Sequence, residues 1–180
     1  MNNKILIVSL FACILAASLV LAANSESAVA KELVAGIKGQ IQIQHPNQTG
    51  EGTKFSVNGV EAHSFLNITA ETAQNISQLK AQMSNGRNAE VKIMPDTASA
   101  TALARLGLKV CNETNNCTIQ LKEVGQGNQT KATYEIKAQQ KVKLFGLFSA
   151  KMDVEAQVDA ENGTAILEKK PWWSFLASEA

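Results

Sequence analysis

The side chains that could carry out chemistry are few and far apart in this chain. His45 and His63 are its two histidines, and neither has an aspartate or a cysteine at the spacing of a metal site or a catalytic triad. The sequence contains no Gly-x-Ser-x-Gly nucleophile motif, no phosphate-binding glycine loop and no haem motif. Asp153 and Glu155 share one face of a predicted strand, where lysines are their expected partners. We therefore expect a protein that is not an enzyme and holds no cofactor or metal ion.

Two cysteines, Cys111 and Cys117, follow the N-terminal apolar segment, which contains the third. In an oxidising compartment their spacing favours a disulfide that closes a short hairpin. The predicted strands of that hairpin are Leu108–Cys111 and Cys117–Val124. The alternative is a redox or metal pair, for which Cys-x2-Cys is the typical spacing.

The N-terminus has the pattern of an export signal. Lys4 precedes the uncharged apolar run Ile5–Ala23, and a polar stretch follows. Small residues allow cleavage after Ala22, Ala23 or Ala30. The apolar run has 19 residues, close to the roughly 20 that a membrane-spanning helix needs, so an uncleaved N-terminal anchor is the alternative. Both readings place the rest of the chain outside the cytoplasm, either secreted or at the cell surface.

Asn-x-Ser/Thr triplets are more frequent than the roughly two that this composition would produce by chance. N-glycosylation of an exported surface is one explanation, and the shared preference of Asn and Thr for turns and strands is the other. The seven candidate asparagines are Asn47, Asn67, Asn75, Asn112, Asn116, Asn128 and Asn162.

Asn-Gly pairs and alternating apolar residues predict β-hairpins in the first half of the chain. A two-residue turn at Asn58-Gly59 would place Val57 opposite Val60 and Phe55 opposite Ala62. Around Asn85-Gly86 the apolar residues on both sides are odd-numbered, which requires a loop of odd length or a bulge. These residues are Leu79, Ala81 and Met83 before the turn, and Ala89, Val91 and Ile93 after it.

The second half begins with a predicted helix, Asp96–Leu106, capped by Asp96 or Thr97 and ended by Gly107. From Lys131 to Asp159 the apolar residues are even-numbered and the odd-numbered positions, mostly polar, are expected to face solvent. A three-residue loop at 145–147 keeps this alternation. It predicts a long hairpin that pairs Leu144 with Phe148, Val142 with Ala150, Ile136 with Ala156 and Lys137 with Glu155. A third strand is expected over Thr164–Lys170.

Two apolar features are unusual for their positions. The hairpin tip, Leu144–Phe148, is apolar although turns are usually polar, and the C-terminal tail after Pro171 is rich in aromatic residues. The tip packs against the rest of the protein or is a contact site. The tail folds back over the core or is an interfacial anchor, with Lys169 and Lys170 facing anionic headgroups. The candidate residues for membrane or partner contact are Phe145, Leu147, Phe148, Trp172, Trp173 and Phe175.

A short motif within Tyr134–Leu167 suggests a family. The motif is a strand that ends in Asp-Ala and is followed by a Gly turn and a return strand. It covers Val158-Asp159-Ala160-Glu161-Asn162-Gly163. It resembles the closing hairpin of the PepSY domain, over roughly residues 96–170. The resemblance implies a small exported α+β module that binds or inhibits a peptidase, although the cysteine loop and the very long strands depart from the PepSY pattern. The ending Pro171–Ala177 resembles uncharacterised exported archaeal proteins, which imply no activity.

These patterns predict an α+β protein that is predominantly antiparallel β. Residues 1–23 are a signal peptide or membrane anchor, 31–95 a β-meander, and 96–180 a helix packed on a long-stranded sheet, either separate from 31–95 or continuous with it. The expected function is that of a non-catalytic cell-surface or secreted module that acts by binding or as an envelope component. The alternatives are a PepSY-like peptidase regulator and a structural or adhesive subunit. The expected partner is an envelope protein, a peptidase or a membrane surface. A net charge of +1 without a basic patch argues against nucleic acid.

Overall fold

The computed structural model describes residues 41–45, 52–73 and 76–179. The predicted export signal with its proposed cleavage sites, and the sequons at Asn47 and Asn75, lie outside these residues. Gly39–Ala180 forms one compact unit, and the described hydrophobic core belongs to it.

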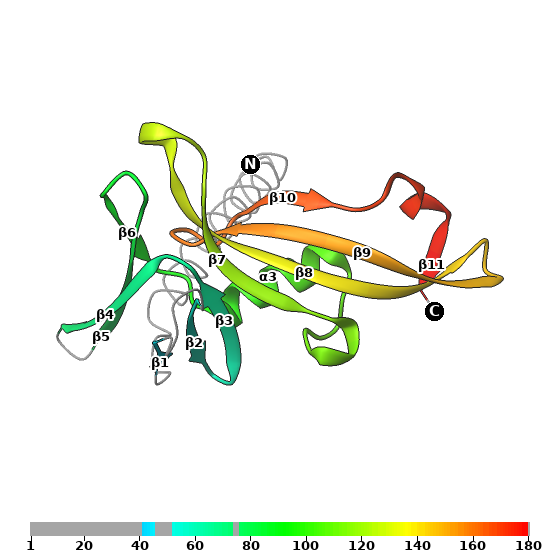
Figure 1. Ribbon diagram of the computed structural model, residues 1–180. Helices are drawn as coiled ribbons and strands as arrows, with labels where there is room; N and C mark the ends of the chain where they lie inside the picture. Colours follow the sequence, from blue (N-terminus) through cyan, green and yellow to red (C-terminus); the bar gives the residue numbers. More distant parts are fainter. Residues whose placement is uncertain (1–40, 46–51, 74–75, 180) are drawn as a thin grey trace, which may run out of the picture. The chain divides into compact units, whose positions relative to one another are not determined.

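Most of the strands belong to one eight-stranded sheet, and three form a second sheet (Figure 1). The second sheet has the order β4 (Asn67–Ala73), β5 (Ile76–Gln82) and β6 (Asn88–Val91). In the large sheet the order is β1 (Gln42–Gln44), β2 (Thr53–Val57), β3 (Val60–Ser64), β7 (Thr118–Val124), β8 (Lys131–Leu144), β9 (Phe148–Asp159) and β10 (Ala165–Lys169), and β11 (Ala177–Glu179) also pairs with β8.

The predicted α+β, β-rich class is confirmed, with one α-helix in the described residues, α3 (Pro95–Leu106). Pairing is antiparallel except between β3 and β7, which run parallel with His63 opposite Gln120 and Ser64 opposite Leu121. No local sequence pattern indicates this pairing, because the two strands are separated by the second sheet and the helix. It joins strands from the predicted first and second halves into a single sheet.

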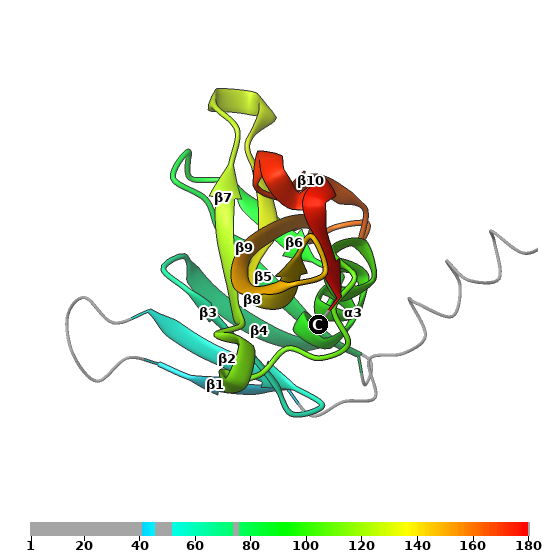
Figure 2. The same cartoon turned by 90° about the vertical axis from the view of Figure 1, so that its right-hand side faces the viewer.

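The helix α3 ends where the sequence predicts and begins slightly earlier. Gly107 has a left-handed conformation (φ 71°) and its N–H donates to the carbonyl of Leu103, which ends the helix. The predicted side-chain cap is wrong: Met94 is the N-cap and Pro95 the first helical residue, so Asp96 lies within the first turn. Its carboxylate accepts hydrogen bonds from Asn58 Nδ2 at 2.6 Å and from the adjacent backbone N–H of Thr97 at 2.8 Å. The helix packs along β9 and β10 and contacts β3 (Figures 1 and 2).

Three of the predicted hairpins are confirmed in register. Asn58 and Gly59 both have positive φ (52° and 79°), and Val57 pairs with Val60 as expected. Strands β5 and β6 are joined by a loop of five residues, 83–87, which has the required odd length. The long hairpin pairs β8 with β9 from Thr133–Asp159 to Leu144–Phe148, with all four predicted pairs present. The third strand is β10, which pairs with β9 through a local register shift.

The predicted hairpin over 108–124 is wrong. Residues 108–111 form no strand, and Glu113–Asn115 forms a short 3-10 helix, η1. The amide of Asn115 donates to the carbonyl of Val110 (2.6 Å) while the Asn112 side chain accepts from the backbone of Thr114 (3.0 Å). These hydrogen bonds from side chains satisfy backbone polar groups within the loop. Strand β7 pairs with β3 and β8.

The core lies on the even-numbered face of β8 and β9, as predicted. Tyr134 and Ile136 are fully buried there, and Phe55 of β2 packs 6.4 Å from the Tyr134 ring. The expectation that the odd-numbered face of β8 is exposed fails at Thr133 and Glu135, which are also buried. Strands flank β8 on both sides at these positions, so that Glu135 lies between Gln120 of β7 and Gln157 of β9. A polar residue in the middle of a wide sheet is thus covered by its neighbours.

Candidate interaction surface

Of the two histidines, His63 is the one that the structure describes as lining a cavity. Its Nε2 lies 3.2 Å from Glu61 Oε1, on the same strand, in an open groove of about 670 Å³ between β3, α3 and the cysteine loop. Both side chains are about half exposed (45% and 52%). The structure records no hydrogen bond from His63 to a described serine or threonine, so the pair faces solvent without an activated nucleophile. His45 is exposed at the end of β1.

The remaining candidates are possible metal ligands and the two carboxylates on β9, Asp153 and Glu155. Within the described ranges no three His, Cys, Asp or Glu side chains are placed to hold a metal ion. Glu155 lies opposite Lys137 and accepts from Lys169 Nζ at 3.4 Å, whereas Asp153 is exposed opposite Gln139. The expected lysine partner is therefore present for Glu155, whereas no ion pair between Asp153 and a described lysine is recorded.

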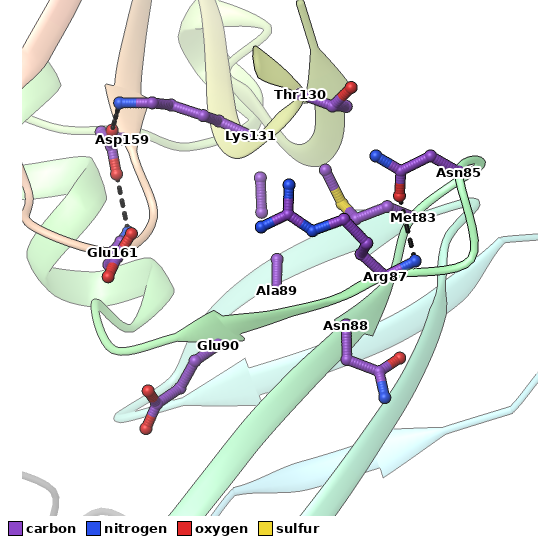
Figure 3. Close-up of a pocket in the computed structure, with 11 residues that line it drawn as sticks. Met83, Asn85, Arg87, Asn88, Ala89, Glu90, Thr130, Lys131, Asp159 and Glu161 are labelled. Carbon is purple, nitrogen blue, oxygen red and sulfur yellow. Dashed lines mark hydrogen bonds and ion pairs between the residues drawn. The ribbon is translucent and has the colours of Figure 1, made fainter. Parts of the chain in front are cut away.

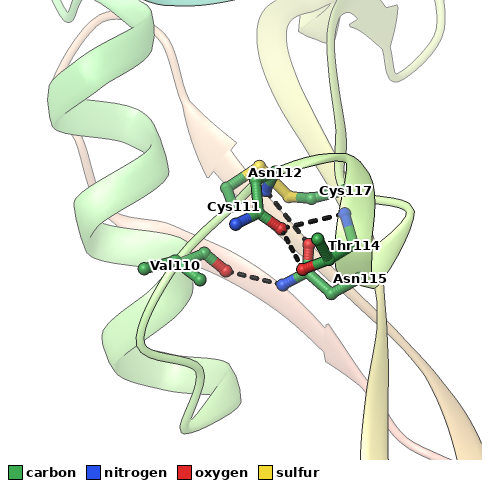
Figure 4. The surroundings of a disulfide bond; sticks show 6 residues. All are labelled: Val110, Cys111, Asn112, Thr114, Asn115 and Cys117. Carbon is green, nitrogen blue, oxygen red and sulfur yellow. Dashed lines mark hydrogen bonds between the residues drawn. A yellow bond between two sulfur atoms is a disulfide. The ribbon is translucent and has the colours of Figure 1, made fainter.

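Cys111 and Cys117 are joined by a disulfide around η1, with Cα atoms 5.0 Å apart (Figure 4). The loop that it closes carries two sequons, at Asn112 and Asn116. The side-chain oxygen of Asn112 accepts from both the backbone N–H and the hydroxyl of Thr114, at 3.0 and 2.6 Å. The disulfide thus joins the loop that follows α3 to the residue before β7.

All the sequon asparagines that the structure describes are exposed. Asn112 and Asn116 flank η1, Asn128 lies in the β7–β8 turn, and Asn162 in the β9–β10 turn. At Asn162 the hydroxyl of Thr164 donates to the side-chain oxygen (2.7 Å), as Thr114 does at Asn112. Asn67 begins strand β4. Each of these amides is accessible, and their glycosylation stays a prediction.

The Asp159 carboxylate holds the turn in the PepSY-like motif. It is buried, and its Oδ1 accepts from the backbone N–H of Glu161 at 2.8 Å and of Asn162 at 3.4 Å. Lys131 Nζ lies 3.3 Å from its Oδ2. These groups border a cavity of about 280 Å³ with both basic and acidic side chains, shown in Figure 3. The Asp in this motif therefore has a local role in forming the turn.

The tip of the β8–β9 hairpin is exposed, so the expectation that it packs against the protein is wrong. Phe145, Leu147 and Phe148 retain 66%, 77% and 66% of their accessible surface. Trp172 and Phe175 of the tail are exposed to 81% and 75%, while Trp173 is partly buried. The tail does fold back, but over the hairpin and not as a lid on the core.

Backbone pairing brings the tail to the tip. The chain passes from β10, beside β9, to β11, which pairs with residues 142–144 on the opposite edge of the hairpin. The N–H of Phe145 donates to the carbonyl of Leu176 at 3.1 Å, next to the 3-10 helix η3 (Trp172–Leu176). Figures 1 and 2 show β11 crossing close to the tip. We call Phe145, Leu147, Phe148, Trp172 and Phe175 the aromatic end.

Phe145 has a backbone conformation that is unfavourable for its type. Its φ of 52° and the φ of 71° at Gly146 match the values at Asn58 and Gly59, where the residue types suit a type I′ turn. Positive φ is uncommon for a bulky side chain, because Cβ approaches the following carbonyl. Phe145 is therefore an exposed aromatic residue in a backbone conformation that disfavours its type.

Phe145→Asn is expected to raise the free energy of unfolding by about 0.5–1 kcal/mol, because Asn adopts positive φ more readily. Urea denaturation measures this change. Phe148→Asn is the matched control: Phe148 is equally exposed but lies in the extended strand β9, where Asn brings no gain. Equal effects of the two substitutions would contradict the assignment of strain to Phe145.

No helix in the described part of the chain has the length and hydropathy of a bilayer-crossing segment. Comparisons of the chain with protein-family models, with curated proteins and with solved structures found no match.

Proposed function

We propose that this chain is an exported, non-catalytic module that acts by binding, and that the aromatic end is its contact surface. The observation that carries the proposal is a set of five large apolar side chains, each at least 66% exposed, on the hairpin tip and on the tail that pairs beside it. Clusters of exposed apolar residues mark interaction sites in soluble domains. A peptidase regulator and an adhesive subunit remain alternative proposals.

The apolar surface of the aromatic end is comparable in free energy with the cost of association. Burying one large apolar side chain contributes roughly 1.5–3 kcal/mol, so five of them contribute on the order of 10 kcal/mol. Association costs an estimated 4–15 kcal/mol in lost freedom of motion. The surface therefore supports weak to moderate binding by itself, and an N-terminal anchor would raise the effective concentration if it is retained.

The PepSY-like alternative has less support. The hydrogen bonds of the Asp159 carboxylate account for the Asp in the motif as a turn-forming residue. They favour a hairpin of similar local form and provide no contact site for a peptidase. The aromatic end lies outside that motif, at the opposite end of β9.

Site-specific photo-crosslinking in the native host tests the proposal. A photoreactive residue at Leu147 is expected to form adducts with a partner, and the additional change Phe148→Ser is expected to reduce them. Gln126 is the matched control position, because it is exposed in the turn at the other end of β8. Equal adducts at both positions, or none at Leu147, would refute the aromatic end as the contact surface.

A further inference from the structure

We infer that the partner of the aromatic end is the surface of an anionic lipid bilayer. This inference rests on the proposed function, because it requires the aromatic end to be a contact surface. It adds the chemical class of the partner, which the exposed aromatic side chains alone do not specify.

Three lysines beside the tip carry the inference. Between Gln140 and Met152 the chain has Lys141, Lys143 and Lys151 and no Asp or Glu. All three lysines are exposed, and none forms an ion pair with a carboxylate of the described residues. Lys169 and Lys170 of the tail, by contrast, pair with Glu155 and Glu168.

Two of these lysines face each other directly. Lys141 lies opposite Lys151 in the β8–β9 register. Like charges at directly opposed positions of an antiparallel pair are destabilising. An anionic surface at this end of the hairpin would remove that penalty, and it would also supply the counter-charge that the described carboxylates do not.

The spacing along the hairpin matches the layers of a bilayer. Lys141 and Lys151 lie three residues behind Leu144 and Phe148, which is about 10 Å along a strand. An apolar surface at a membrane interface is buried by roughly 5–10 Å. Insertion of the tip to this depth would therefore bring the ammonium groups to the level of the lipid phosphates.

The composition favours a bilayer over a protein partner. Lysine is depleted in protein–protein interfaces, whereas tryptophan and lysine together are typical of the membrane–water boundary. Neither of the two cavities described above is lined by residues of the aromatic end. The exposed surface of this end therefore suits insertion into a fluid layer better than it suits the reception of a peptide.

Tryptophan fluorescence of Gly39–Ala180 tests the inference, since this compact unit excludes the apolar N-terminal segment. A cooperative thermal transition first verifies that the fragment is folded. Trp172 and Trp173 are the two tryptophans of the chain, so the emission reports on the tail alone. Phosphatidylcholine vesicles containing phosphatidylglycerol are expected to shift the emission to shorter wavelength, and brominated lipid to quench it. Pure phosphatidylcholine should bind far more weakly.

Changing Lys141, Lys143 and Lys151 to Ser is expected to weaken binding to the anionic vesicles by about 100-fold, because each lysine near such a surface contributes roughly fivefold. The matched control removes Lys54 of β2, Lys80 of β5 and Lys92, which follows β6. It should change binding far less. Equal losses in the two triple variants would show non-specific charge attraction and overturn the inference.

The vesicle and crosslinking results separate the two proposals. If vesicles leave the emission unchanged while Leu147 forms adducts with a protein in the host, the bilayer inference fails and the contact surface stands. If vesicles leave it unchanged and Leu147 forms no more adducts than Gln126, both fail.

Discussion

Replacing Glu135 with Gln is expected to lower the free energy of unfolding by about 3 kcal/mol at neutral pH, and to have almost no effect at pH 2. The carboxylate is only 6% exposed. Burial opposes its ionisation, but hydrogen bonds and charge from Lys122 and Lys137 outweigh burial and hold the pKa of Glu135 at about 2. The pKa is therefore well below the usual 4.5 for a glutamate.

The pH dependence follows from the direction of this shift. The folded state binds a proton at Glu135 less readily than the unfolded state, so the carboxylate stabilises the fold above pH 4.5. That contribution is lost as the pH falls from 4.5 through 2. The difference of about 2.5 pKa units corresponds to roughly 3 kcal/mol. The neutral Gln variant lacks this contribution at every pH.

Urea denaturation of both proteins between pH 7 and pH 2 measures the effect. The stabilities of the two proteins should converge as the pH falls. Asp153→Asn is the matched control, because Asp153 is an exposed carboxylate on β9, and its loss should change stability by less than about 0.5 kcal/mol. A constant gap between wild type and Glu135→Gln across the whole range would contradict the proposed role of the charge.

Tyr134→Phe is expected to increase the free energy of unfolding by about 1–3 kcal/mol, against the usual direction for a core substitution. The Tyr134 hydroxyl is fully buried and has no hydrogen-bond partner among the described residues. An unsatisfied buried hydroxyl costs about this much in desolvation. Burial, with a further contribution from the nearby Asp96 carboxylate, raises the pKa of Tyr134 and keeps the hydroxyl neutral.

Thermal and urea unfolding of three variants isolate this effect. Thr133→Val should also stabilise the protein, because the Thr133 hydroxyl is likewise buried without a partner. Ser64→Ala is the control with the opposite sign: the buried Ser64 hydroxyl donates to the carbonyl of Leu121 at 2.9 Å and accepts from the N–H of Leu66 at 3.1 Å. If Tyr134→Phe destabilises the protein as much as Ser64→Ala does, the Tyr134 hydroxyl has a partner after all.

Local patterns were sufficient to predict three of the four hairpins, the exception being the one over 108–124. The alternation from Lys131 to Asp159 and the odd-length tip predicted the β8–β9 register residue by residue. The turn at Asn58-Gly59 and the end of α3 at Gly107 were predicted for the same reason: each depends on backbone conformations that few residue types adopt. In these segments the neighbouring residues along the chain contain the information that decides the structure.

Contacts between distant segments decided the rest. The parallel pairing of β3 with β7, and the burial of Glu135 between Gln120 and Gln157, depend on which strands become neighbours in the sheet. A polar residue at an odd position is exposed in an isolated hairpin and buried in a wide sheet. Alternation along one strand therefore predicts which residues share a face, but not which faces are covered.

The same distinction between local sequence and tertiary contacts applies to the candidate surface. The sequence by itself determined that the tip and the tail are both apolar, and that the tip is a turn. Only the tertiary structure decided that the two meet. Strand β7 covers the edge of β8 only as far as Lys137, and the three residues of β11 pair with the open edge at 142–144. A strand of three residues has too little sequence pattern to be predicted. Its place depends on an unpaired sheet edge formed by residues far away in the chain.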